Sequence, residues 1–378
     1  MGKVNGMIRS ILRKLGITHF VRRRLLLGRI NRERRNESNL ITSGIPSSYF
    51  EPLTPGERNQ IIELWGGIDE IKDINFREFE MFKRMNGFDA RYLTHDIYLP
   101  VIARLLNDYR YTTIFDDKGL AGYIKPTHIR FPYCYARRIN SDYYDNEMRQ
   151  IPLEKVLELC IHQNAIFIKP SKNTSGGHGA KLIRFGQYPI SERERILLEE
   201  INRRNYDYVI QECINQHPVM AQFNPSSVNT LRITTLMLNG RYSLCSVILR
   251  CGKEGLHVDN WGAGGLLVPV TSDGKVTETG LDNRLNQYTS SGKCVFEKCQ
   301  IPQLPEILKL VERCHREDFA ICKLIGWDIT IDSTGNPVII ELNSSQPGVI
   351  GEQLLQQPIF GDRTQEVIEY CKSKIFSY

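Results

Sequence analysis

The stretch GWDITIDSTGNPVIIELNSSQPG, residues 326–348, decides the fold, and the rest of the chain is interpreted around it. Two apolar runs, residues 327–331 and 338–342, flank a turn made of Ser, Thr, Gly and Asn. Apolar runs separated by a short glycine-containing turn are typical of a β-hairpin. The stretch therefore predicts two antiparallel strands.

Side-chain alternation along these strands places polar groups together. Glu341 and Asn343 are predicted to share one face, and Asp328 on the partner strand can lie opposite them. The other face is predicted to carry Val338, Ile340 and Leu342. Two carboxylates and an amide oxygen suit Mg²⁺, which takes a few protein ligands plus phosphate oxygens. The alternative is the solvent-facing polar side of an ordinary hairpin.

A second signal is the sequence AIFIKPSKNTSGGHGAKLIRF, residues 165–185. It predicts an apolar strand that ends at Lys169, a polar loop with three glycines over residues 171–179, and a second strand over residues 180–185. Backbone N–H groups of such a loop could wrap phosphates, and Lys169 could reach a phosphate as a point charge. The loop is not a Walker A motif, and a loose hairpin loop is the alternative.

Two further strands carry candidate ligand-binding groups. Residues 208–211 form an apolar strand that runs into a connector, where Gln211 or Glu212 could take an adenine amine or a ribose hydroxyl. Residues 228–252 predict a hairpin around an Asn-Gly turn. Its first strand carries Arg232, which is costly among apolar neighbours unless it pairs with a phosphate or a carboxylate.

Weaker patterns fill the remaining chain. Residues 57–65, 76–85, 153–163 and 191–204 are predicted as helices, and residues 95–108 as a helix interrupted near Pro100. Residues 112–115 are predicted as a short strand, followed by Lys118 at the start of a helix, where an exposed lysine is the ordinary interpretation. Residues 307–324 are predicted as one helix and residues 351–376 as a helical tail.

Charge is concentrated at the N-terminus. Residues 1–35 carry a net charge of +10, so the remainder of this +6 chain carries −4 (6 minus 10). Ile8, Ile11, Leu12 and Leu15 recur at helical spacing among basic residues. Such a helix can lie on an anionic membrane surface, and it could equally dock on a partner or on the chain itself. Few aromatic residues accompany the basic ones, so nucleic acid is not expected as a partner.

Composition indicates a globular protein of two or three lobes. The 378 residues are 41% hydrophobic and 24% charged, and no apolar run approaches the about 20 residues that span a bilayer. The ten cysteines are scattered without a CxxC pair, which indicates reduced thiols. Without a signal-peptide pattern, we expect a cytoplasmic location, with the basic arm allowing contact with the inner face of the membrane. Oligomeric state has no sequence signal.

The order of these pieces resembles the ATP-grasp fold, an α+β fold in which two subdomains clamp ATP. Within that superfamily, the chain resembles the sugar-transfer-associated ATP-grasp family of bacterial polysaccharide biosynthesis, through FDDKGL, IFIKPSKNTSGGHG, VIQECI, VNTLRITT, DNWGAGG and GWDITID…IIELNSSQPG. The resemblance covers roughly residues 88–361. The charge pattern and the resemblance together predict a basic arm (1–40), a helical region (41–125), a lid subdomain (126–214) and a core subdomain with the metal site and the C-terminal helix (215–378). The resemblance does not explain the arm or the linker that follows it.

The resemblance also implies roles for individual residues. Lys169 and Lys118 would line the phosphates of ATP, and Arg232 would stabilise the transferring phosphoryl group. The lid would consist of Ser175, Gly176, Gly177 and Gly179. The adenine would be held by Gln211, Glu212, Cys213 and Ile214. Mg²⁺ would be held by Asp328, Glu341 and Asn343.

The implied reaction is ATP-dependent ligation of a carboxylate to an amine through an acylphosphate. The expected carboxylate is a uronic acid or an amino acid, joined while a capsular polysaccharide or exopolysaccharide is built or decorated. One alternative is a kinase that phosphorylates a sugar hydroxyl. Another is a non-catalytic nucleotide-binding module of a glycan-assembly complex. The sequence names neither substrate.

Overall fold

A computed structural model of the chain describes residues 17–37, 40–71, 73–172, 178–253 and 259–374. The chain forms two compact units, one of Met1–Leu105 with Phe360–Tyr378 and the other of Leu106–Ile359. The four-part division expected from the sequence, with boundaries at residues 40, 125 and 214, stays a prediction. The last helix, which that division places with residues 215–378, belongs to the unit that contains the N-terminal residues.

The first unit is helical. The predicted helices near residues 57–65 and 76–85 are confirmed, and the first of them begins with a capping box between Thr54 and Glu57. The predicted interruption near Pro100 is a π-helical turn. The elements are α2 (Ile17–Glu37), η1 (Ser47–Tyr49), α3 (Pro55–Trp65), α4 (Arg77–Asn86), α5 (His95–Ile97), η2 (Tyr98–Ile102), η6 (Gly361–Arg363) and α13 (Thr364–Lys372).

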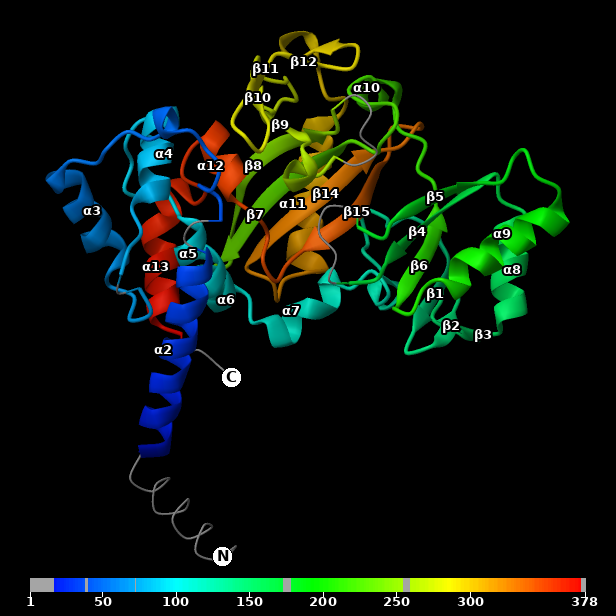
Figure 1. The fold of residues 1–378 in the computed structure, drawn as a ribbon, viewed down its shortest axis with the longest axis horizontal. Coiled ribbons are helices and arrows are strands. Elements are labelled where there is room, and N and C mark those ends of the chain that lie inside the picture. The colour runs from blue at the N-terminus through cyan, green and yellow to red at the C-terminus, as the bar shows by residue number, and fades with distance from the viewer. Residues whose placement is uncertain (1–16, 38–39, 72, 173–177, 254–258, 375–378) are drawn as a thin grey trace, which may run out of the picture. The chain divides into compact units, whose positions relative to one another are not determined.

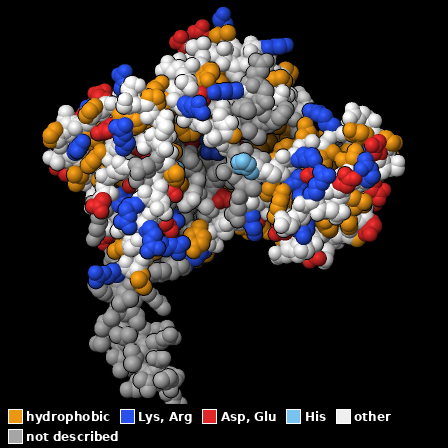
Figure 2. Space-filling view, viewed as in Figure 1, with side chains coloured by type: hydrophobic (Ala, Val, Ile, Leu, Met, Phe, Trp, Pro, Cys, Tyr) orange, Lys and Arg blue, Asp and Glu red, His pale blue; other side chains and the backbone are white. Residues whose placement is uncertain are grey.

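Helix α2 contains the end of the predicted basic arm. Ile30 and Arg34 are buried, and the Arg34 guanidinium forms an ion pair with Asp96 at 2.9 Å. The end of the arm therefore packs inside the first unit. Figure 2 shows Lys and Arg side chains over α2. Within residues 24–37 of this helix, the exposed basic residues are Arg24, Arg29, Arg32 and Arg35. The amphipathic pattern of residues 8–15 lies outside the described residues.

Within the described parts of the chain, no helix combines the length and the apolar character needed to cross a bilayer. The proposed surface contact of residues 1–35 with a membrane stays a prediction.

The second unit contains a six-stranded antiparallel sheet in the order β3-β2-β1-β6-β4-β5 (Figure 1). Helices α8 (Leu153–Ile161) and α9 (Ile190–Asn202) cover one face, and their apolar side chains form a core with Ile166, Ile168 and Ile210 of the sheet. The strands are β1 (Cys134–Ile139), β2 (Asp142–Tyr144), β3 (Gln150–Ile151), β4 (Ala165–Pro170), β5 (Lys181–Arg184) and β6 (Tyr208–Glu212). The predicted strands and helices of this region are confirmed.

A seven-stranded antiparallel sheet follows, in the order β11-β10-β9-β8-β7-β14-β15. Its apolar face packs against α11 (Leu304–Glu317), and the core includes Trp327, Ile329 and Val311. Asn239 and Gly240, with φ of 51° and 74°, form the predicted tight turn between β7 and β8. The strands are β7 (Thr230–Leu238), β8 (Arg241–Cys251), β9 (Leu266–Pro269), β10 (Gly280–Leu281), β11 (Gln287–Tyr288), β14 (Leu324–Ile331) and β15 (Pro337–Asn343).

Both sheets are antiparallel, with α8 and α9 on one face of the first and α11 on the apolar face of the second, which confirms the predicted α+β class. The short elements that complete the chain are α6 (Ala103–Leu106), α7 (Tyr109–Asp116), η3 (Ala121–Tyr123), α10 (Pro218–Ala221), η4 (Trp261–Ala263), β12 (Ser290–Ser291), β13 (Cys294–Val295), η5 (Phe296–Lys298) and α12 (Ile350–Leu355).

Three sequence predictions about single elements are wrong. Residues 112–115 belong to α7 rather than to a strand, because the Asp108 side chain caps the helix by accepting from the N–H of Arg110 and this outweighs the β-branched residues. Helix α11 ends at Glu317, and residues 318–323 form a turn in which Phe319 is buried. The predicted tail is two helices, α12 and α13, with Pro358 between them.

Candidate nucleotide and metal site

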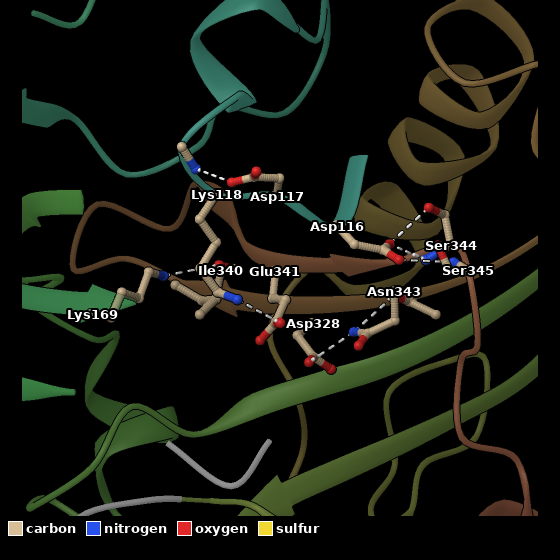
Figure 3. A network of polar contacts seen from close by, with 12 residues as sticks. Asp116, Asp117, Lys118, Lys169, Asp328, Ile340, Glu341, Asn343, Ser344 and Ser345 are labelled. Carbon is tan, nitrogen blue, oxygen red and sulfur yellow. Dashed lines mark hydrogen bonds and ion pairs between the residues drawn. The ribbon is translucent and has the colours of Figure 1, made fainter. Parts of the chain in front are cut away.

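The β14–β15 hairpin forms as predicted, with Asp328 directly opposite Glu341. The predicted alternation on β15 is wrong at one point, because a β-bulge at Ile340 inserts one residue between the pairs Asp328–Glu341 and Ile329–Ile339. As a result Ile339, and not Ile340, joins the buried core with Leu342. The bulge leaves Glu341 and Asn343 on the polar face with Asp328, as Figure 3 shows.

Asp328 is held by two arginines from neighbouring strands. Arg232 on β7 donates from Nε to Oδ1 at 2.7 Å and from Nη2 to Oδ2 at 3.0 Å. Arg250 on β8 donates from Nη1 to both oxygens at 2.9 Å. Burial opposes ionisation of this carboxyl, but the two guanidinium groups prevail and lower the pKa of Asp328 to about 2. Asp328 is therefore an ionised carboxylate that orients two arginines.

Arg250 was not identified from the sequence. Its Nη2 also lies 3.8 Å from Oδ1 of Asp259, a half-buried carboxylate that accepts a hydrogen bond from the Thr230 hydroxyl. Like Arg232, Arg250 interrupts an apolar strand, in the sequence SVILRC. The same argument from an isolated arginine among apolar residues applies to both, so the signal was present in the sequence.

Two lysines lie beside the β14–β15 strand pair (Figure 3). Lys118 precedes the six-stranded sheet in the chain, and Lys169 lies within that sheet. Lys118 donates from Nζ to Glu341 Oε1 at 2.8 Å. Lys169, at the end of β4, donates from Nζ to the carbonyl of Ile340 at 3.3 Å. Lys118 lies in a turn rather than at a helix start, and its N–H donates to the carbonyl of Ser171. The structure thus brings both predicted lysines to the predicted metal residues.

Lys169 differs from Lys118 in its electrostatic environment. Its side chain is buried, and among the described residues no carboxylate forms an ion pair with it. Burial, together with the charge of Lys118, lowers the pKa of Lys169 to about 8. A buried ammonium held only by a backbone carbonyl lacks a counter-charge, which a phosphate would supply.

The predicted adenine-binding residues lie where β6 leaves the six-stranded sheet. Gln211 is buried in the strand, and Cys213 and Ile214 follow it at half-buried positions. The Glu212 carboxylate accepts from the Tyr133 N–H at 2.7 Å and forms an ion pair with Arg130. Because Glu212 has these partners within the protein, its carboxylate fixes residues 130–133, the segment that leads into β1, at the end of β6. The adenine contact stays a prediction.

The predicted lid is described in part. Ser175, Gly176 and Gly177 lie outside the described residues. Gly179 has a φ of 76°, and a Cβ there would lie 2.9 Å from Pro170, so glycine is required at this position. The Arg204 guanidinium donates to the Gly179 carbonyl at 2.8 Å. This contact fixes the end of the loop against the helix side of the sheet.

The loop after β15, residues 344–348, directly follows the predicted metal-binding residues. Its first N–H groups are already used, because Asp116 accepts from Ser344 N at 2.6 Å and from Ser345 N at 3.0 Å. Further along, Pro347 lies over Gly326, where a Cβ would be 2.9 Å from the proline side chain. Asp116, which sequence reasoning missed, therefore ties the loop to α7.

A buried carboxyl lies on the same polar face of the sheet as Arg232. Glu352, on α12, accepts from the Thr234 hydroxyl at 2.9 Å and from the Ser246 hydroxyl. Burial raises the pKa of Glu352 to about 7, against the opposing charge of Arg232. This residue, too, was not identified from the sequence.

The donor set suits a phosphate chain with a divalent cation. Within the described residues, no three His, Cys, Asp or Glu side chains form a metal-binding group, and the predicted set contains two carboxylates and one amide. Both oxygens of Asp328 already accept from arginines, so Glu341 and Asn343 offer the more open oxygen atoms. The unpaired cation of Lys169 beside these oxygens fits a Mg²⁺-bound polyphosphate.

Solved structures match the chain at low similarity. D-alanyl-alanine synthetase A from Vibrio cholerae matches with a TM-score of 0.36 and 11% identity, covering 72% of this chain and 66% of that one. L-amino acid ligase from Bacillus licheniformis matches at 0.38 and 11%, covering 68% and 47%. N5-carboxyaminoimidazole synthetase from Staphylococcus aureus, complexed with ADP, matches at 0.38 and 11%, covering 69% and 54%. The chain thus spans between about half and two thirds of these proteins.

Sequence comparison is more specific. No curated protein matches the chain at a significant level. The family model described as sugar-transfer associated ATP-grasp matches residues 102–369, which contain both sheets and every predicted site residue. The chain therefore belongs to the sugar-transfer associated ATP-grasp family.

Proposed function

We propose that the protein is an ATP-dependent ligase that joins a carboxylate to an amine through an acylphosphate. One observation carries this proposal. The buried Lys169 ammonium lacks a carboxylate partner among the described residues and faces the strand that holds Glu341 and Asn343. A lysine without a counter-charge beside hard oxygen atoms supports a site for a polyphosphate and a divalent cation.

The residues of the site would divide the work as follows. Bound ATP supplies the phosphoryl group, and Mg²⁺ neutralises its charge. Lys169 and Lys118 would bind phosphate oxygens, while Glu341, Asn343 and Asp328 would hold the metal. Arg232, oriented by Asp328 at 2.7 Å, would face the phosphoryl group during transfer. The glycine-rich loop would cover the site and exclude water from the acylphosphate.

The substrates are proposed from the family description, which associates these proteins with sugar transfer. The carboxylate would be a uronic acid or an amino acid, and the product a component of a capsular polysaccharide or exopolysaccharide. The enzyme would act in the cytoplasm. Residues 1–35 would bring it to the membrane where glycan precursors are held.

A screen for ADP release tests this proposal. The full-length protein is incubated with Mg²⁺, ATP, a uronic acid or amino acid, and an amine, and products are identified by mass spectrometry. We expect ADP formation to require both substrates and the product mass to equal their sum minus one water. Glu341→Gln is expected to lower the rate at least tenfold, whereas Glu312→Gln, on the exposed face of α11, should not.

Two results would contradict the proposal. A stable phosphorylated sugar formed without an amine would identify a kinase. Full ATP turnover by the Glu341→Gln variant would remove the site described above from the reaction.

A further inference from the structure

Buried basic side chains are the starting point. Among the described residues six Lys or Arg side chains are buried, and four of them have a carboxylate partner: Arg34, Arg204, Arg250 and Arg363 pair with Asp96, Glu200, Asp328 and Glu366. The remaining two are Lys169 and Arg137, for which the described residues provide no carboxylate. A buried cation without a counter-charge is strongly unfavourable.

These two residues lie in one row of one sheet face. Arg137 on β1 is directly opposite Val209 on β6, and Val209 is directly opposite Lys169 on β4. Opposite residues of antiparallel strands point to the same face. Their backbones are two strand spacings apart, about 10 Å, and both side chains are long. The other face of the same strands, with Ala136, Ile168 and Ile210, packs on the helices.

The two cationic groups also gather around one side chain. Cys134 occupies the same face, opposite Gln211, and its thiol is buried. Burial raises the pKa of Cys134, and the charges of Arg137 and then Lys169 oppose that rise. Cys134, Arg137 and Lys169 therefore share one face of the sheet, the face from which Lys169 reaches Ile340.

The described groups around Arg137 provide few hydrogen-bond acceptors for its guanidinium. Its side chain is 2% exposed, and Nε has no hydrogen-bond acceptor among the described residues. Nη1 lies 2.8 Å from the sulfur of Met148, a weak acceptor. Gly122 in η3 packs directly on the guanidinium, since a Cβ there would lie 1.8 Å from Nη1. The fold thus keeps a glycine over an arginine whose charge no described side chain neutralises.

We propose that Arg137 is a second anion-binding residue of the six-stranded sheet, and that Arg137 and Lys169 bind one polyphosphate chain between them. The identification of the anion as the phosphate chain of a nucleotide rests on the proposed function. The charge imbalance itself does not, because it follows from burial and pairing alone. Arg137 is destabilising in the free protein and becomes favourable when the anion binds.

Substitution of Arg137 tests this, because the proposal predicts opposite effects on the free and the bound protein. Arg137→Met removes the buried charge and keeps most of the side-chain volume. We expect the melting temperature of the free full-length protein to stay the same or rise. We expect the dissociation constants for MgATP and for inorganic tripolyphosphate, measured by calorimetry, to rise at least tenfold, while that for adenosine changes less than twofold.

The neighbouring arginine provides the matched control. Arg138 follows on β1 with its side chain on the opposite face, where it donates to the Tyr206 carbonyl at 3.1 Å and to the Ser141 hydroxyl. Arg138→Met should leave the affinity for MgATP and tripolyphosphate within twofold. Arg137→Lys keeps a charge without the planar guanidinium, and it should retain more of the affinity than Arg137→Met.

The outcomes separate this inference from the proposed function. If the original protein binds neither MgATP nor tripolyphosphate, the proposed function fails. If it binds them and Arg137→Met binds them equally well, the proposed function stands and the role of Arg137 is wrong. An Arg137→Met protein that melts below the original protein in the absence of ligand, or that does not fold, also overturns the inference, because a structural arginine would behave in that way.

Discussion

The two sheets of the second unit treat their buried charges differently. On the seven-stranded sheet, Arg232 and Arg250 face Asp328, and Arg250 also lies near Asp259, so the cations have carboxylate partners. On the six-stranded sheet, Lys169 and Arg137 have none among the described residues. The two arginines of the seven-stranded sheet are neutralised by carboxylates without a ligand, whereas the two cations of the six-stranded sheet are not neutralised by any described residue. The difference indicates that an anion binds against the six-stranded sheet.

The comparison also separates residues that support the fold from residues that await a ligand. Removing one member of a buried ion pair leaves the other charge uncompensated, which costs about 3–5 kcal/mol. Removing a buried cation that has no counter-charge instead removes the free-energy cost of burying an unpaired charge. Substitution of these charged residues should therefore lower the free energy of unfolding on the seven-stranded sheet and leave it equal or higher on the six-stranded sheet.

The largest effect is expected on the seven-stranded sheet. Asp328→Asn leaves Arg232 and Arg250 without their shared carboxylate, so the free energy of unfolding should fall by about 3–5 kcal/mol in urea denaturation without ligand. Glu317→Gln removes an exposed carboxylate that pairs with His128, and it should cost less than about 1 kcal/mol. A loss below 1 kcal/mol for Asp328→Asn would show that the paired cluster does not stabilise the fold.

A smaller effect of different kind is expected for Lys169→Met. Without ligand, its free energy of unfolding should equal or exceed that of the original protein, because a buried unpaired charge is removed. Its affinity for MgATP should fall about ten- to a hundredfold, the equivalent of one charged hydrogen bond. Lys155→Met changes a partly exposed lysine on α8 and serves as the control. Strong destabilisation of the free Lys169→Met protein would contradict the expected difference between the two sheets.

The smallest effect is expected from pH. Burial and the neighbouring Lys118 lower the pKa of Lys169 to about 8, so the free protein loses this charge as pH rises through 8. Affinity for MgATP should therefore decline above pH 8, by at most about tenfold for each pH unit. Calorimetry from pH 6.5 to 9.5 measures this. Lys169→Arg stays charged throughout and should abolish the decline. Constant affinity of the original protein up to pH 9.5 would contradict the lowered pKa.

Much of the site could be predicted from local sequence, because alternation and turn chemistry act over a few residues. Asp328, Glu341 and Asn343 are on one face as expected, and the Asn239-Gly240 turn sets the β7–β8 hairpin. Glu352 was missed because its partners, Thr234 and Ser246, lie on β7 and β8, and the packing of a helix on distant strands does not follow from a local pattern. Arg137 resembles a surface arginine until its strand is placed beside β6.

The errors in secondary structure have local physical causes. Residues 112–115 have strand-like composition, but the cap at Asp108 and the burial of Thr112 select a helix. Helix α11 could be predicted from its apolar spacing, but its end at Glu317 depends on the burial of Phe319 in the core. Propensity describes what a segment prefers alone, and tertiary packing decides the rest.

The bulge at Ile340 has a consequence for comparing this chain with its relatives. It shifts the inward–outward pattern of β15 by one residue between Ile339 and Glu341. An alignment that scores only the alternation of apolar and polar residues along this strand will be out of phase on one side of the bulge. In such an alignment Glu341 would fall on a core position of the relative, or Ile339 on a ligand position. A homologue that lacks the bulge should therefore be aligned from the Glu-x-Asn end of the strand, with a one-residue gap at position 340.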